Sequence, residues 1–152
     1  MNTLTGLALG VVLAACAGVS EKAAEERPDG AGTVNVRIEG VNSAKGSVYA
    51  SIYLTTEGFP EDKELAYTYQ FEKAQSKSVE FTFEDIPAGW LAVAVLHDED
   101  MNEELTLGNL GIPKEAYGFS NNPDSLFGPP GFDESAVRLE DGATVNLVVE
   151  LN

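Results

Sequence analysis

The sequence predicts an all-β fold, a single antiparallel β-sandwich of about seven strands with one long ordered loop. Three observations support this prediction. Apolar and polar residues alternate with a period of two, turns rich in Gly, Pro and Asp separate the alternating segments, and neither a heptad pattern nor an internal repeat is present. Such alternation places one face of each strand in a core, and seven short strands fit two packed sheets.

The strands are predicted from the alternation and the turns that bound it. The turn 40–46 predicts a hairpin between the first two strands, and Glu140-Asp141-Gly142 predicts a second hairpin between the last two. The fifth strand is almost continuously apolar, which suits the centre of a sheet. Trp90, Phe81 and Phe83 are expected in the core. The seven predicted strands are 33–39, 47–54, 65–71, 78–83, 90–96, 136–139 and 143–151.

The N-terminal segment predicts export. Residues 4–15 form an uncharged apolar segment, shorter than the roughly 20 residues that a membrane-spanning helix needs. It ends in Leu-Ala-Ala-Cys-Ala-Gly, which resembles the bacterial lipobox, where a signal peptidase cleaves before a cysteine that carries diacylglycerol. We therefore expect a signal peptide at 1–15, lipid attachment at Cys16 and a polar tether up to residue 32. The usual basic residues before the apolar segment are absent.

The anchor predicts the location of the protein, and the charge restricts the kinds of partner that it can bind. A multiply acylated cysteine holds a protein stably on a membrane, and Ala17 follows Cys16 where inner-membrane lipoproteins typically have Asp. The expected location is the cell envelope, on the outer membrane facing the periplasm. The formal net charge of −16 disfavours nucleic acids and anionic lipid headgroups as partners, and the single cysteine excludes an intrachain disulfide.

The stretch 97–134 lacks a clear strand pattern. Loops longer than about 15 residues are uncommon in compact domains and are often functional. Its aromatic residues predict an ordered cap rather than a loose insertion. These residues are Tyr117, Phe119, Phe127 and Phe132.

The central part of the chain resembles a bacterial family. The segment 86–100, Ile-Pro-Ala-Gly-Trp-Leu-Ala-Val-Ala-Val-Leu-His-Asp-Glu-Asp, the segment 110–122, Leu-Gly-Ile-Pro-Lys-Glu-Ala-Tyr-Gly-Phe-Ser-Asn-Asn, and Gly-Pro-Pro-Gly-Phe at 128–132 resemble the DUF2141 family. The resemblance covers 33–151 and assigns residues 33–152 to one domain. It implies an exported sandwich with no established activity. The Pro-x-Gly-Trp turn is similar to that of transthyretin-like domains, so the expected sandwich is immunoglobulin-like or transthyretin-like.

Family members often carry a calcium-type loop after the fifth strand. Here Asp98, Asp100 and Asn102 keep the one-three-five spacing of such loops, and the Glu104 carbonyl and Thr106 supply further oxygens. Glu103 replaces the turn glycine, Thr106 replaces an Asp, and the twelfth position is Asn109. The alternative is an acidic, solvated turn whose side chains cap their own backbone.

A second candidate site contains aromatic and amide side chains suited to a protein or glycan partner. The alternative is that the aromatic residues are buried and the Asn residues occupy left-handed turn positions. A Ser120-His97-Asp98 hydrolase is disfavoured because no nucleophile-elbow pattern surrounds Ser120. We therefore expect a non-enzymatic binding or structural module with no cofactor other than calcium. The residues of this second site are His97, Tyr117, Phe119, Asn121 and Asn122.

Overall fold

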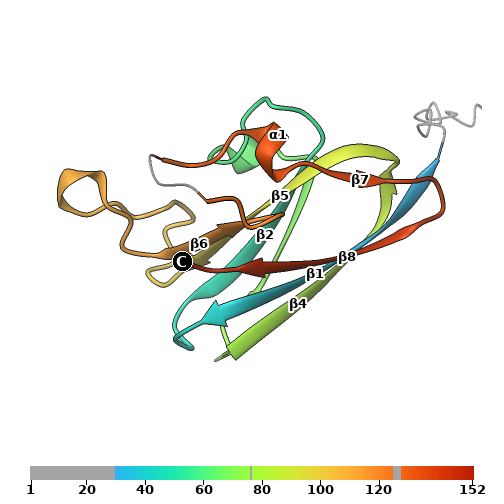
Figure 1. Ribbon diagram of the computed structural model, residues 1–152. Helices are drawn as coiled ribbons and strands as arrows, with labels where there is room; N and C mark the ends of the chain where they lie inside the picture. Colours follow the sequence, from blue (N-terminus) through green and yellow to red (C-terminus); the bar gives the residue numbers. More distant parts are fainter. Residues whose placement is uncertain (1–29, 76, 125–127) are drawn as a thin grey trace, which may run out of the picture.

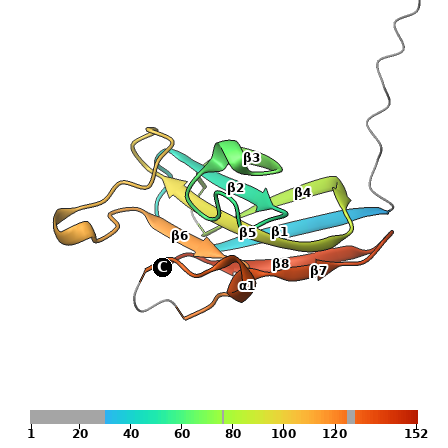
Figure 2. The ribbon, with the colours of Figure 1, turned by 90° about the horizontal axis from the view of Figure 1, so that it is seen from above.

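The computed structural model describes residues 30–75, 77–124 and 128–152, so the predicted signal peptide, Cys16, most of the predicted tether and Phe127 lie outside the described residues. Two β-sheets pack face to face, which confirms the predicted all-β sandwich (Figures 1 and 2). None of the helices in the described residues is long and apolar enough to cross a membrane.

Within the described residues, eight strands make up the two sheets. The smaller sheet has the order β4-β1-β8, and the larger has the order β3-β2-β5-β6, with β7 also paired to β5. All strand pairs are antiparallel except β1 with β8. The strands are β1 (Ala31–Val41), β2 (Ser47–Tyr53), β3 (Thr68–Lys73), β4 (Lys77–Pro87), β5 (Gly89–Asp98), β6 (Ala116–Phe119), β7 (Val137–Leu139) and β8 (Thr144–Glu150). Short helices are η1 (Lys63–Leu65), η2 (Asn109–Gly111) and α1 (Phe132–Ser135).

The main core lies between the sheets and follows from the predicted alternation. Every second residue of the long strands points inward, which is the physical meaning of a period of two. The inward residues of β1, β2, β4 and β5 include Val34, Val36 and Ile38 on β1, Val48, Ala50 and Ile52 on β2, Val79, Phe81 and Phe83 on β4, and Leu91, Val93 and Val95 on β5.

Trp90 is not in this core, so its predicted burial is wrong. It precedes inward-facing Leu91 on β5 and therefore points to the opposite face, where its side chain is 55% exposed. Because the sequence of this strand is almost continuously apolar, it shows no alternation from which the outward direction of Trp90 could be predicted. The Arg138 guanidinium lies 5.8 Å from the centre of the Trp90 ring and covers part of it.

Both predicted hairpins are wrong. β1 and β2 belong to different sheets, so the turn 40–46 crosses between the two layers. β7 pairs with β5 and β8 with β1, because the turn between them binds the start of β1: Gly142 N–H donates to the Ala31 carbonyl at 2.9 Å, and Ala31 N–H donates to Asp141 Oδ1 at 3.2 Å. β1 thus begins at Ala31, inside the segment predicted as tether.

A second, smaller apolar cluster covers the outer face of the larger sheet. Phe119 is buried there, and Tyr117 and Phe132 are half-buried. The predicted long loop is therefore shorter than expected: β5 extends through Asp98, and β6 and α1 interrupt the remainder. The other members of the cluster are Tyr53, Phe59, Ala66 and Ala94.

Candidate functional site

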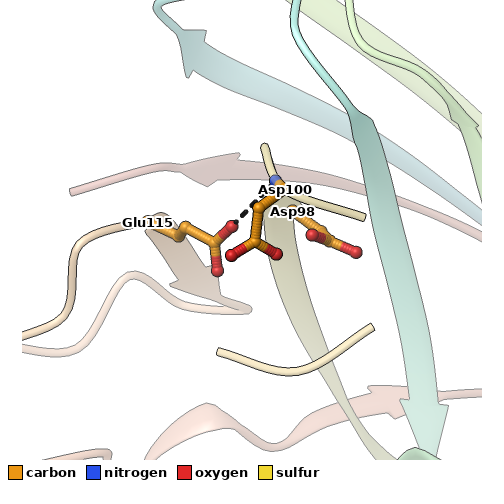
Figure 3. A group of neighbouring side chains, drawn as sticks. All are labelled: Asp98, Asp100 and Glu115. Carbon is orange, nitrogen blue, oxygen red and sulfur yellow. Dashed lines mark hydrogen bonds between the residues drawn. The ribbon is translucent and has the colours of Figure 1, made fainter. Parts of the chain in front are cut away.

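Three carboxylates meet where β5 ends and β6 begins (Figure 3). Asp98 is the last residue of β5, Asp100 follows it in the loop, and Glu115 directly precedes β6. The pairing of His97 with Ala116 brings these two strand ends together. One oxygen from each carboxylate lies within 4.8 Å of the others, which is about twice the 2.3–2.6 Å distance of a calcium–oxygen bond. The three oxygens can therefore share one cation.

The carboxylates also hold the loop between them in shape. Glu115 Oε1 accepts N–H bonds from Glu99 (2.9 Å) and Asp100 (3.4 Å), and its Oε2 accepts one from Thr106 (2.9 Å). The Asp98 carboxylate accepts N–H bonds from Asn102 (3.2 Å) and Glu103 (2.9 Å). These contacts fit the predicted alternative of a self-capped turn.

The remaining predicted ligands lie around this group. Thr106 Oγ1 donates to Asp100 Oδ2 at 3.0 Å and accepts from Asn102 Nδ2 at 2.9 Å. Asn102 Oδ1 accepts from Glu104 N–H at 2.8 Å. The loop therefore brings Asp98, Asp100, Asn102 and Thr106 together.

Glu103 occupies the position at which calcium-type loops carry glycine. Its φ is +65°, the left-handed conformation that glycine adopts at no steric cost. The substitution therefore leaves the turn in place, with an expected conformational cost of about 1 kcal/mol. The Glu103 carboxylate pairs with Lys63 Nζ.

The site is strongly negative. Asp98 and Glu115 are buried and Asp100 is exposed, and no lysine or arginine in the described residues forms an ion pair with any of the three. Burial, followed by the negative charges of Glu103 and Asp98, raises the pKa of the Tyr49 hydroxyl. Buried carboxylates without an opposite charge are costly even when backbone N–H groups bond to them, and a bound cation reduces that cost.

Sequence reasoning missed Glu115. The twelfth position of the loop, counted from Asp98, is Asn109, which has no carboxylate, and Glu115 lies six residues further on. The residues between Thr106 and Glu115 form a projecting turn that brings the chain back to the site. The pairing of Ala116 with His97 could have revealed Glu115, but β6 has four residues with Gly118 among them and gives only a weak strand pattern.

His97 and Ser120 are engaged in separate structural contacts. His97 is fully buried, and its Nε2 donates to the Lys45 carbonyl at 2.9 Å. Ser120 Oγ accepts from Val93 N–H at 2.9 Å and donates to the Ser135 carbonyl at 2.5 Å. Val93 and His97 are four residues apart on β5, roughly 13 Å along the strand. The structure therefore does not assemble the Ser120-His97-Asp98 arrangement.

The two asparagines after β6 occupy left-handed turn positions, with φ of +65° at Asn121 and +45° at Asn122. Asn121 Nδ2 donates to the Ala136 carbonyl at 2.9 Å. Asn122 Nδ2 donates to the Val148 carbonyl at 3.0 Å, and its Oδ1 accepts from Glu150 N–H at 2.9 Å. Asn122 thus joins the larger sheet to β8 of the smaller one.

Replacing Asn122 with glycine is expected to destabilise the fold by about 2 kcal/mol. Glycine keeps the left-handed conformation, so the change reports the loss of two hydrogen bonds to β8, each contributing about 1 kcal/mol. Urea unfolding measures the effect. Asn42→Gly, at an exposed turn residue, is the control, and equal stabilities of the two variants would contradict the role assigned to Asn122.

Comparison with known proteins places the chain in a bacterial group. A family model described as an uncharacterized protein conserved in bacteria, DUF2141, matches residues 36–146. This match spans most of the two sheets and the whole carboxylate site. Neither the comparison with curated proteins nor the comparison with solved structures finds a match.

Proposed function

The chain belongs to the DUF2141 family, and we propose that it is a non-enzymatic lipoprotein of the cell envelope whose β5–β6 loop binds one calcium ion. The observation that carries the calcium proposal is the convergence of Asp98, Asp100 and Glu115, with oxygens within 4.8 Å and two of the three carboxylates buried. Glu115 supplies the acidic ligand that the loop sequence alone lacks.

The chemistry of the donors favours calcium over transition metals. Carboxylate, amide and hydroxyl oxygens surround the site, and these hard ligands suit calcium or magnesium rather than zinc or copper. His97, whose Nε2 is bound to the Lys45 carbonyl, is not among them. A loop with oxygens of several kinds suits the irregular coordination of calcium better than the strict octahedron of magnesium.

The proposed role of the ion is structural. It would replace repulsion among three carboxylates with attraction to one centre, and so fix the loop that joins β5 to β6. The loop presents its exposed residues to a partner only if its base is rigid. The residues first considered for partner binding, Phe119, Asn121 and Asn122, pack or bond within the domain, so the proposed recognition surface is the exposed loop beyond Asp100.

Calcium titration tests this proposal. We expect isothermal titration calorimetry to give one site per chain, and millimolar calcium to raise the unfolding temperature, because a ligand that binds only the folded state stabilises it. Asp100→Asn, at an exposed ligand position, is expected to weaken binding without loss of the fold, and Asp98→Ala to abolish it.

The control is Asp133→Asn, which removes an exposed carboxylate on α1 and is expected to leave the titration unchanged. Absence of both heat and thermal shift at millimolar calcium would end the calcium proposal. Equal losses in Asp133→Asn and Asp100→Asn would instead show that binding depends only on the general negative charge.

The lipid anchor is the second part of the proposal, and the lipobox-like sequence before Cys16 supports it. We expect the protein from bacterial membranes to carry acyl mass on Cys16 and to partition into detergent, and Cys16→Ala to lose both properties. Outer-membrane fractions are expected to contain the protein because Ala17 is not Asp. Intact mass spectrometry that finds an unmodified Cys16 would overturn the lipoprotein assignment.

A further inference from the structure

The turn that carries the chain from the calcium site back to β6 exposes its apolar residues. We call residues 105–114 the apolar finger. Leu110 is 97% exposed, Ile112 63% and Leu107 54%. In Figures 1 and 2 the finger is the orange loop that projects beyond both sheets. A small protruding tip with three exposed aliphatic side chains is typical of an interaction site.

Three backbone hydrogen bonds close the finger on itself. Gly108 N–H donates to the Ile112 carbonyl at 2.7 Å and Lys114 N–H to the Thr106 carbonyl at 2.9 Å, which together form the bridge between Leu107 and Pro113, and Gly111 N–H donates to the Gly108 carbonyl at 3.3 Å. Leu110 is held at φ +66°, a conformation that leucine rarely adopts. These bonds pair the base of the finger internally, and the headgroup region, where water is present, can hydrogen-bond the remaining backbone groups at its tip.

The charge of the finger differs from that of the rest of the chain. Lys114 is its only charged residue, so the finger is +1 in a chain of −16. Lys114 is exposed, its stem packs beside Gly108, and it forms no ion pair within the described part of the chain. Three aliphatic side chains above a free ammonium match the acyl chains and phosphates of an anionic lipid surface.

We propose that the apolar finger inserts into the headgroup region of an anionic lipid bilayer, with Lys114 at the phosphate level. Only the calcium dependence of this insertion rests on the proposed calcium site. A bound cation would neutralise the carboxylates at the base of the finger, which otherwise repel the anionic bilayer. The finger lies at the opposite end of the domain from the start of β1.

The proposed anchor permits this contact with its own membrane. Gly30 lies 14 residues after Cys16, a segment that reaches up to about 46 Å when extended. β1, with 11 residues, is about 36 Å long. The fully extended segment is therefore about 10 Å longer than β1, which favours contact between the finger and the bilayer that holds Cys16.

The test uses the full chain with Cys16→Ser, which makes the readout independent of acylation and leaves no native thiol. An environment-sensitive fluorophore on Asn109→Cys, an exposed finger residue, reports insertion into vesicles of phosphatidylethanolamine and phosphatidylglycerol that carry nitroxide-labelled lipids. We expect a blue shift and quenching at this position, and neither with the label on Thr56→Cys.

Leu110→Asn in the labelled chain is the critical variant, because Asn tolerates the left-handed conformation. We expect about tenfold more lipid for half-maximal quenching, since one leucine side chain no longer enters the bilayer. Val148→Thr, at an exposed position on β8, is the control and is expected to change nothing. Unfolding temperatures of both variants confirm that the domain is intact.

The outcomes separate this proposal from the calcium proposal. Insertion that needs calcium supports both calcium binding and lipid insertion. Insertion that is equal with calcium and with a chelator supports lipid insertion and shows that it does not depend on the ion. A label that stays in water with vesicles, in either condition, overturns lipid insertion. A blue shift without vesicles that grows with protein concentration also overturns it, because a second copy would then cover the finger.

Discussion

Gly46→Ala is expected to destabilise the protein by about 3 kcal/mol or more. Gly46 has φ of +66°, and a Cβ at this position would lie 1.8 Å from the Asp98 carbonyl oxygen and 2.7 Å from Glu99 Cα. The left-handed conformation costs alanine about 1–2 kcal/mol, and overpacking typically adds about 1–3 kcal/mol. The atom that the new Cβ would meet is a backbone oxygen at the end of β5, so the strand itself must shift.

The protein contains a matched control for this change. Gly142 has φ of +67°, and a Cβ there meets nothing within 4 Å. Gly142→Ala should therefore cost only the conformational part, about 1 kcal/mol. Urea unfolding of both variants isolates the close approach of Gly46 to Asp98. Equal free energies of unfolding would show that the turn 42–46 does not support the base of the site.

Glu115→Gln is expected to weaken calcium binding by about a hundredfold or more. Glutamine keeps the size of the side chain and removes one negative charge from the three. Loss of a residue that only hydrogen-bonds to a metal ligand lowers the metal affinity about 10–100-fold. Loss of a carboxylate that binds the metal directly should therefore lower the affinity by at least about a hundredfold. Calorimetry or competition with a fluorescent chelator measures the change.

The control for this variant is Glu99→Gln. Glu99 lies beside the site in sequence, but its carboxylate accepts a hydrogen bond from Ser43 Oγ at 2.8 Å and is not part of the carboxylate group. We expect nearly native affinity. Binding that survives Glu115→Gln but not Glu99→Gln would place the ion elsewhere in the loop.

The sequence predicts the layers of this fold better than its connections. The period of two in β1 and β4 shows which residues face the core, because alternation depends only on the local backbone. It carries no information on which strands are neighbours. The two predicted hairpins failed for this reason: the turn 40–46 crosses between sheets, and Asp141 and Gly142 bind Ala31 at the start of β1 instead of closing a hairpin.

The same limit explains the partial prediction of the site. Asp98, Asp100 and Asn102 are recognised because their spacing is local, and a tight turn brings such residues together. Glu115 is brought to them by the pairing of β6 with β5, which is a non-local contact. β6 itself is hard to recognise because Gly118 interrupts it, yet glycine is required there: a Cβ would lie 2.5 Å from the Glu150 carbonyl oxygen.

The exposed finger shows a further limit. Leu107, Leu110 and Ile112 are apolar, and a sequence pattern alone would assign them to packing. Their exposure results from the turn that starts at Thr106 and returns at Lys114, held at its base by the Glu115 carboxylate. The exposure of the finger can therefore be recognised only from the structure of the carboxylate site at its base.

A crystal structure of the protein grown in calcium chloride decides the claim that the β5–β6 loop binds calcium. We expect a single ion between β5 and β6, bound by oxygens of Asp98, Asp100 and Glu115 at about 2.3–2.6 Å. Anomalous scattering identifies the ion and distinguishes it from water. A site without density, with the three carboxylates bonded only to backbone N–H groups as in a self-capped turn, would contradict the claim.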